Sequence, residues 1–230
     1  MTDSLEWIAV VSLVVAFVSF VVVAGDIALG RRQHMWIMNL VWPLTMLYAG
    51  PIGLWAYYSF GRRKAHGAGH AMTDARGSMK PKSPGWRAVA TGTLHCGSGC
   101  TLGDIVGESL VGAAGWTLAG KAMWAAWIVD FLFAYFFGIA FQYFAIKPMR
   151  QLRPAQALIA AVKADTLSLA AWQIGMYGWM AIATFAIFER ELDKSGPLFW
   201  FMMQIAMLCG FVTSVPANWW LIRAGIKERM

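Results

Sequence analysis

Six apolar runs, each long enough to cross a bilayer as a helix, make up most of this 230-residue chain. A transmembrane helix needs about 20 residues to span a hydrocarbon core about 30 Å thick. Only 13% of the residues are charged, whereas a soluble domain carries about a quarter. The sequence therefore predicts an all-α polytopic transmembrane bundle with about six spans. The predicted spans are residues 7–29, 35–60, 88–118, 122–145, 155–188 and 197–222.

Basic residues between the runs predict the orientation. The segment 61–87 is rich in Lys and Arg, and such loops stay in the cytoplasm. Six spans then place both termini in the cytoplasm, in the inner (plasma) membrane. Arg31 and Arg32 disagree, because six spans put them outside; if 35–60 were re-entrant, the N-terminus would lie outside instead. The net charge of +7 is explained by loops that face lipid headgroups, so we expect no nucleic-acid partner.

We divide the chain into residues 1–60 with the first two helices, the basic loop 61–87, and a four-helix membrane core over 88–230. The third run carries the motif HCGSGC at residues 95–100, followed by two acids. Ionisable groups are costly in hydrocarbon and therefore rare there unless they form a site or a pathway.

Two of the motif's residues, Cys96 and Cys100, lie one above the other if the run is helical. Thiols suit soft ions, so we expect a site for Cu(I) first and Zn(II) second. His95 points about 100° away on an ideal helix and joins the site only if the helix is distorted at Gly97 and Gly99. The cysteines could instead be packing residues, or form a disulfide if the motif is a loop.

Three acids are candidates for a proton or ion relay: Asp104, Glu108 and Asp130 in the fourth run. Structural pairing is the alternative for each of them. Glycines at every fourth position, Gly99 among them, allow a neighbouring helix to approach closely. This glycine-lined face of the predicted helix could pack against another helix of the same chain or against a second copy in a homo-oligomer.

Four further residues are weaker candidates. Lys163 and Asp165 predict either an interfacial pair or part of a cytoplasmic gate. Met203 and Met207 are spaced for one helix face, where thioethers are either secondary soft ligands or simple packing.

The motif HCGxGCTLGD, together with KADTLS at 163–168, FWFMMQ at 199–204 and NWWLI at 218–222, resembles an uncharacterised family of bacterial membrane proteins, catalogued as a domain of unknown function. The resemblance covers roughly residues 88–230. It implies a copper connection and assigns no catalytic residue.

Three functions fit these observations. The first is transport or membrane handling of a soft metal ion. The second is a thiol-redox protein that passes electrons to a quinone or haem. The third is an assembly subunit whose polar centre only holds helices together. The chain has no large extramembrane domain for soluble catalysis, so we expect ion binding or transport rather than an enzyme.

Overall fold

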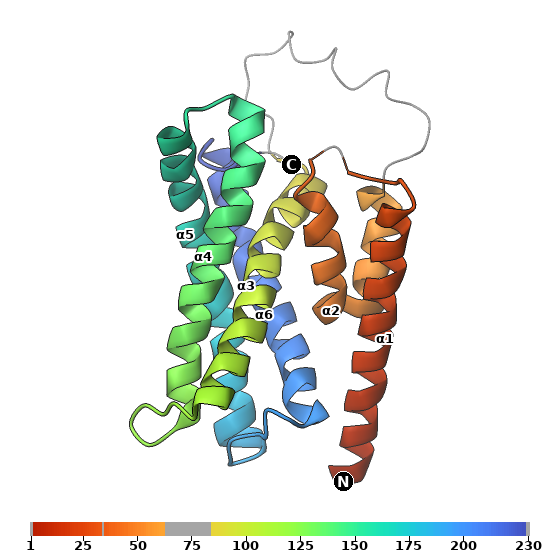
Figure 1. The fold of residues 1–230 in the computed structure, drawn as a ribbon, viewed down its shortest axis with the longest axis vertical. Helices are drawn as coiled ribbons and strands as arrows, with labels where there is room; N and C mark the ends of the chain where they lie inside the picture. The colour runs from red at the N-terminus through yellow and green to blue at the C-terminus, as the bar shows by residue number, and fades with distance from the viewer. Residues whose placement is uncertain (1, 34, 63–83, 229–230) are drawn as a thin grey trace.

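The computed structural model describes residues 2–33, 35–62 and 84–228, which form a helical bundle without strands in those ranges (Figure 1). Within these ranges, four helices are long and apolar enough to cross a membrane: α1 (Thr2–Ala28), α4 (Ala122–Arg150), α5 (Pro154–Ile182) and α6 (Pro197–Arg223). The all-helical prediction is thus confirmed, whereas most of the basic loop 61–87 lies outside the described residues. The α-helices are α1 Thr2–Ala28, α2 Met38–Ala56, α3 Trp86–Ala114, α4 Ala122–Arg150, α5 Pro154–Ile182 and α6 Pro197–Arg223, with short π-helices at Tyr57–Gly61 and Ala183–Ile187.

Local chemistry sets several helix ends. Pro154 and Pro197 occupy the first turn of α5 and α6, where the missing N–H costs nothing. Gly115 ends α3 in the left-handed region, with φ 64°, and its N–H donates to the Val111 carbonyl.

The second apolar run does not cross the bundle. At Gly50 the backbone adopts φ 47° and ψ −126°, a conformation open essentially to glycine. Pro51 follows and has no N–H, so the Leu47 carbonyl lacks its usual donor one turn later. Gln204 of α6 replaces that donor, with Nε2 2.8 Å from the Leu47 oxygen. Ser12 of α1 in turn donates to Gln204 Oε1 at 2.7 Å.

After this break the chain returns to the end from which it came, so residues 35–62 form a helical hairpin beside α1 (Figure 1). The return is fixed at Asp26 near the end of α1, which accepts hydrogen bonds from the Tyr57 hydroxyl and from Arg62, both at 2.8 Å. Trp42 packs edge-on against Tyr57, with ring centroids 5.5 Å apart. Residues 35–60 therefore do not form the one continuous span along the bundle that was predicted, and the two ends of the chain lie at opposite ends of the bundle (Figure 1).

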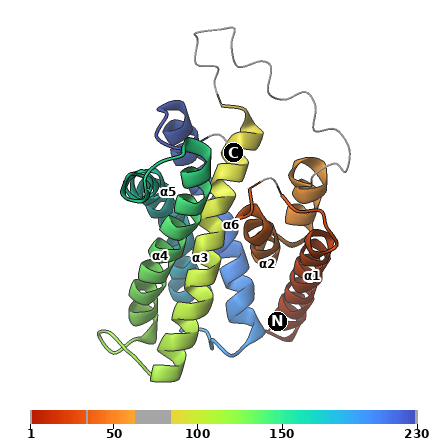
Figure 2. The same ribbon diagram turned by 45° about the horizontal axis from the view of Figure 1, so that its top comes forward.

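Helix α3 lies in the middle of the bundle, in contact with α2, α4, α5 and α6 (Figure 2). It packs antiparallel to α4 through small residues in matched register, with Gly99 against Gly138 and Gly103 against Ala134. A Cβ at Gly99 would lie 2.8 Å from the Gly138 nitrogen. The predicted glycine-lined face of α3 is thus used within the chain.

Candidate functional site

Helix α3 buries most of its polar side chains, because other helices surround it. The exposed fraction is 3% for Asp104 and 5% for Glu108. A bundle that keeps carboxyl groups away from lipid in this way marks them as candidates for a site.

Cys96 and Cys100 are fully buried, free, and one helical turn apart on α3. They pack in one cluster with the side chains of Trp172, Met176 and Met207. The Gln173 amide of α5 approaches Cys100 Sγ at 4.0 Å, the outer limit for a hydrogen bond to sulfur. The two thiols therefore lie in a packed core cluster that contains several methionines.

His95 is buried but does not join the cysteines. Its Nδ1 lies 3.3 Å from the Thr91 carbonyl of the preceding turn, and Lys227 lies nearby. Helix α3 runs undistorted through Gly97 and Gly99, so the condition for convergence is not met. No group of three or more His, Cys, Asp or Glu side chains is arranged to hold a metal within the described ranges.

The three relay candidates come together near the far end of α3. Glu108 forms an ion pair with Lys194, which reaches in from the segment before α6. Asp130 of α4 lies beside Glu108 and opposite Gly107, where any Cβ would collide with the Asp130 carboxylate. Glycine at position 107 therefore makes room for a carboxylate between two closely packed helices.

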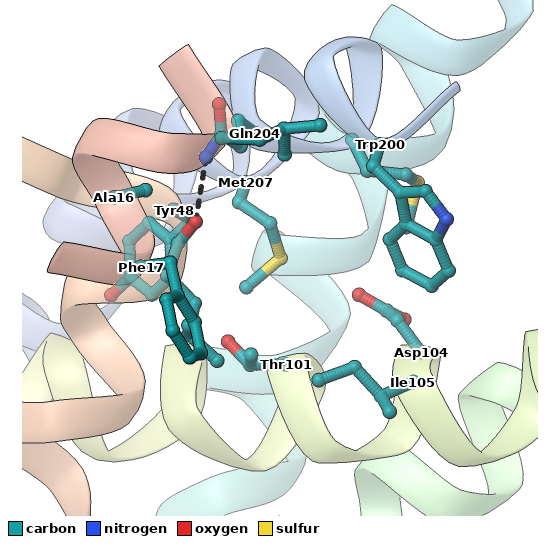
Figure 3. Close-up of a pocket in the computed structure, with 12 residues that line it drawn as sticks. Ala16, Phe17, Tyr48, Thr101, Asp104, Ile105, Trp200, Gln204 and Met207 are labelled. Carbon is teal, nitrogen blue, oxygen red and sulfur yellow. Dashed lines mark hydrogen bonds between the residues drawn. The ribbon is translucent and has the colours of Figure 1, made fainter. Parts of the chain in front are cut away.

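Asp104 has no hydrogen-bond donor for either carboxylate oxygen among the described residues. It faces a cavity of about 420 Å³ between α1, α2, α3 and α6 (Figure 3). Met203 and Met207 of α6 also line this cavity, with Trp200 on the same side. The structure thus brings the two predicted thioether ligands and one predicted relay acid to the same space.

Lys163 and Asp165 do not form the predicted pair. Asp165 is 1% exposed and lies against Gly138 of α4, whereas the Lys163 side chain is exposed. Residues two apart on a helix point about 200° apart, so both cannot face the same neighbour. Asp165 belongs to the buried polar groups and Lys163 does not.

We call these buried groups, taken together, the polar row: Glu108, Asp130, Asp104, Cys100, Cys96 and Asp165. Lys194 stands at one end, and Lys227 lies at the other, where its Cε approaches the position that a Cβ of Gly92 would occupy. From Gly92 to Glu108, α3 rises about 24 Å, which is most of a hydrocarbon core about 30 Å thick. Together with the two lysines, the polar row therefore extends over about 24 Å of α3.

Sequence reasoning missed the two lysines at the ends of the row. Lys194 precedes the last apolar run and Lys227 follows it, so the sequence suggests that both are ordinary solvent-exposed loop residues. Lys227 is only 2% exposed, and its Nζ donates to Asn218 Oδ1 at 2.6 Å. Burial lowers the pKa of this lysine, and the neighbouring Asp165 and Cys96 partly oppose that shift.

Comparisons with known proteins bear on the same part of the chain. A family model described as "Domain of unknown function (DUF4396)" matches residues 85–227, which are α3 to α6 and the turn that carries Lys227. No curated protein and no solved structure gave a significant match. The matched segment is more than half of the chain and contains the whole polar row, so this protein belongs to the DUF4396 family of unknown function.

Proposed function

We propose that this protein carries a soft monovalent cation, Cu(I), through the membrane along the polar row, with protons exchanged on the buried carboxyl groups. The observation that carries the proposal is the placement of two free, fully buried thiols within a row of buried acids. Thiolate and thioether sulfur selects Cu(I), and both kinds lie together in this core.

Cu(I) suits this core better than Zn(II). A structural or catalytic zinc site takes at least three protein ligands with fixed geometry. The described residues offer no such group, but two adjacent thiols can hold a Cu(I) ion, with Met203 and Met207 at the neighbouring cavity as a second station. The copper connection that the family resemblance implies points the same way.

Proton exchange follows from the chemistry of thiol ligands. Each thiol that binds a metal ion releases a proton. Asp104 lies one turn from Cys100 and has no other hydrogen-bond donor in the described part of the chain, so it is placed to take that proton. Asp130 and Glu108 continue the row toward Lys194.

The proposed topology has five crossings and one re-entrant hairpin, in the inner (plasma) membrane. The hairpin returns the chain to the end of α1, where Arg31 and Arg62 both contact Asp26. Helices α4 and α6 end in Arg150 and Arg223 at that same end of the bundle, so the conflict that six crossings leave is removed. With that basic end in the cytoplasm, the C-terminus lies inside and the N-terminus outside.

Equilibrium binding tests the proposal. We expect purified protein in detergent to withdraw Cu(I) from a chromophoric Cu(I) chelator, and Cys96→Ala and Cys100→Ala to lose this ability. Cys209→Ala is the matched control, because Cys209 is a free cysteine of the same bundle outside the polar row. If the parent takes up no Cu(I), or if either row variant binds as well as Cys209→Ala, the proposal fails.

Transport is tested separately in proteoliposomes. Asp104→Asn keeps the shape of the side chain but cannot exchange a proton, so we expect Cu(I) binding to persist while Cu(I)-dependent proton movement is lost. An assembly subunit, the third interpretation, would show neither activity in the parent. The redox alternative would need a Cys96–Cys100 disulfide, and the helical conformation of 96–100 separates these Cβ atoms too far for one.

A further inference from the structure

We propose that Ser168 and Asn218, with the buried carboxylate of Asp165 nearby to balance the charge, form a binding site for a small monovalent cation, and that the Lys227 ammonium group occupies this site from within the chain. The inference does not need soft-ion transport, because the site is built from oxygen atoms and its readout is the binding of hard cations.

Lys227 reaches the site because the chain reverses direction after α6. Gly225 adopts φ 71°, and the Ile226 and Lys227 N–H groups both donate to the Leu221 carbonyl, at 3.0 and 3.2 Å. Arg150, at the end of α4, holds the turn from outside through an ion pair with Glu228. The lysine side chain is thereby directed into the bundle rather than into solvent.

The oxygen ligands are fixed in orientation before any cation arrives. Asn218 Nδ2 donates to Ser168 Oγ at 2.7 Å and to the Ser214 carbonyl at 2.9 Å. This leaves Asn218 Oδ1 free to accept, and Lys227 Nζ lies 2.6 Å from it and 3.4 Å from Ser168 Oγ. The amide therefore presents its carbonyl, not its NH₂ group, to the ammonium.

The single negative charge near the site, on Asp165, can balance one positive charge. Asp165 is buried and interacts with Lys227, although it lies beyond the distance of a direct ion pair. Neither of its carboxylate oxygens has a donor within the described ranges. One carboxylate with neutral hydroxyl and amide oxygens matches a monovalent cation, whereas Ca²⁺ and Mg²⁺ sites rely on more carboxylates or several waters.

Removing the lysine side chain tests the site. We expect Lys227→Ala to melt below the parent in choline chloride, and to recover when potassium or ammonium chloride replaces it at equal ionic strength. A ligand at ten times its Kd raises the Tm of a protein of this size by about 3–6 °C. The parent and the control Lys163→Ala, an exposed lysine on α5, should show no such gain.

The double variant Lys227→Ala/Asp165→Asn should lose the recovery, because its site has no charge. Equal recovery in the parent or in the double variant would overturn the proposal. A second measurement uses the unaltered chain: potassium should compete with the ammonium and increase labelling of Lys227 by an amine-reactive reagent, with Lys163 as the reference. Labelling of Lys227 that potassium does not change, together with no cation-dependent shift in any Lys227→Ala protein that folds, would also refute it.

Discussion

Replacing Gly103 by alanine tests how closely α3 and α4 must approach each other. A Cβ at this position would lie 2.7 Å from the Ala134 Cα and 2.9 Å from its Cβ. Both contacts are with atoms fixed to the helix, so the helices have to separate. Overpacking of this kind costs about 1–3 kcal/mol.

Alanine is also more favourable than glycine inside a helix, by about 0.5–1 kcal/mol, and this gain would mask part of the packing cost. Gly112→Ala removes the ambiguity, because Gly112 lies on the same helix and a Cβ there meets nothing within 4 Å. The propensity gain is common to both variants, so the difference between them reports the packing alone.

We expect Gly103→Ala to be less stable than Gly112→Ala by about 2 kcal/mol, or about 4–8 °C in Tm for a chain of this length. Thermal unfolding in detergent, followed by the fluorescence of the 13 tryptophans, measures this difference. A Gly103→Ala protein that melts at or above Gly112→Ala would show that the close approach of α3 and α4 is not required, and the packing argument would be refuted.

Three further predictions follow from other parts of the structure. Gln204→Leu leaves the buried Leu47 carbonyl without its donor and should lower the free energy of unfolding by about 1–3 kcal/mol; an unchanged denaturation midpoint would mean that the hairpin tip does not depend on this bond. Lys194→Met should destabilise the fold more than Lys194→Met combined with Glu108→Gln, because the single change leaves a buried carboxylate unpaired, and additive effects in this double-mutant cycle would argue against the pair. In a chain without its native cysteines, single cysteines placed before α1 and after α6 should react with impermeant thiol reagents from opposite sides of the membrane; labelling from the same side would restore six crossings.

The sequence predicted the all-helical fold and identified the three acids as candidates, but it did not show that Asp130 lies beside Glu108. Apolar runs predict helices because a backbone in lipid must satisfy its own hydrogen bonds. Asp104 and Glu108 are four residues apart, so any helix places them on one face, and an isolated Asp130 in the next span has few other partners. The glycine spacing predicted close packing of α3 for the same reason, although it did not identify α4 as the neighbour.

The hairpin could be predicted only in part. Gly50 and Pro51 are residues at which a helix can kink or break, and Arg31 and Arg32 conflicted with six crossings. Neither feature predicts the direction that the chain takes after the break. The direction depends on Asp26, which binds Arg62 of the returning segment, 36 positions further along the chain.

No feature of the sequence near Lys227 predicts that this lysine is buried. A lysine after a transmembrane helix usually faces the lipid headgroups, and nothing in the sequence around it distinguishes this one. Its position depends on a positive φ at Gly225 and on Arg150, which comes from another helix. His95 does not reach the cysteines, because α3 stays regular at Gly97, which packs against the Trp172 and Tyr48 side chains, and at Gly99, which packs against the α4 backbone.

At two positions of the polar row, a glycine on one helix leaves room for a carboxylate from the neighbouring helix. Asp130 fits against Gly107, and Asp165 fits against Gly138, and in both cases a Cβ would occupy the position of the carboxylate. A helix pair packed through larger residues would hold its axes further apart and leave gaps that lipid or other side chains would fill. Close packing through glycine instead leaves spaces that are just large enough for a carboxylate and that exclude lipid. At Gly107 and Gly138, the close approach of two helices and the space for a buried acid therefore depend on the same residue.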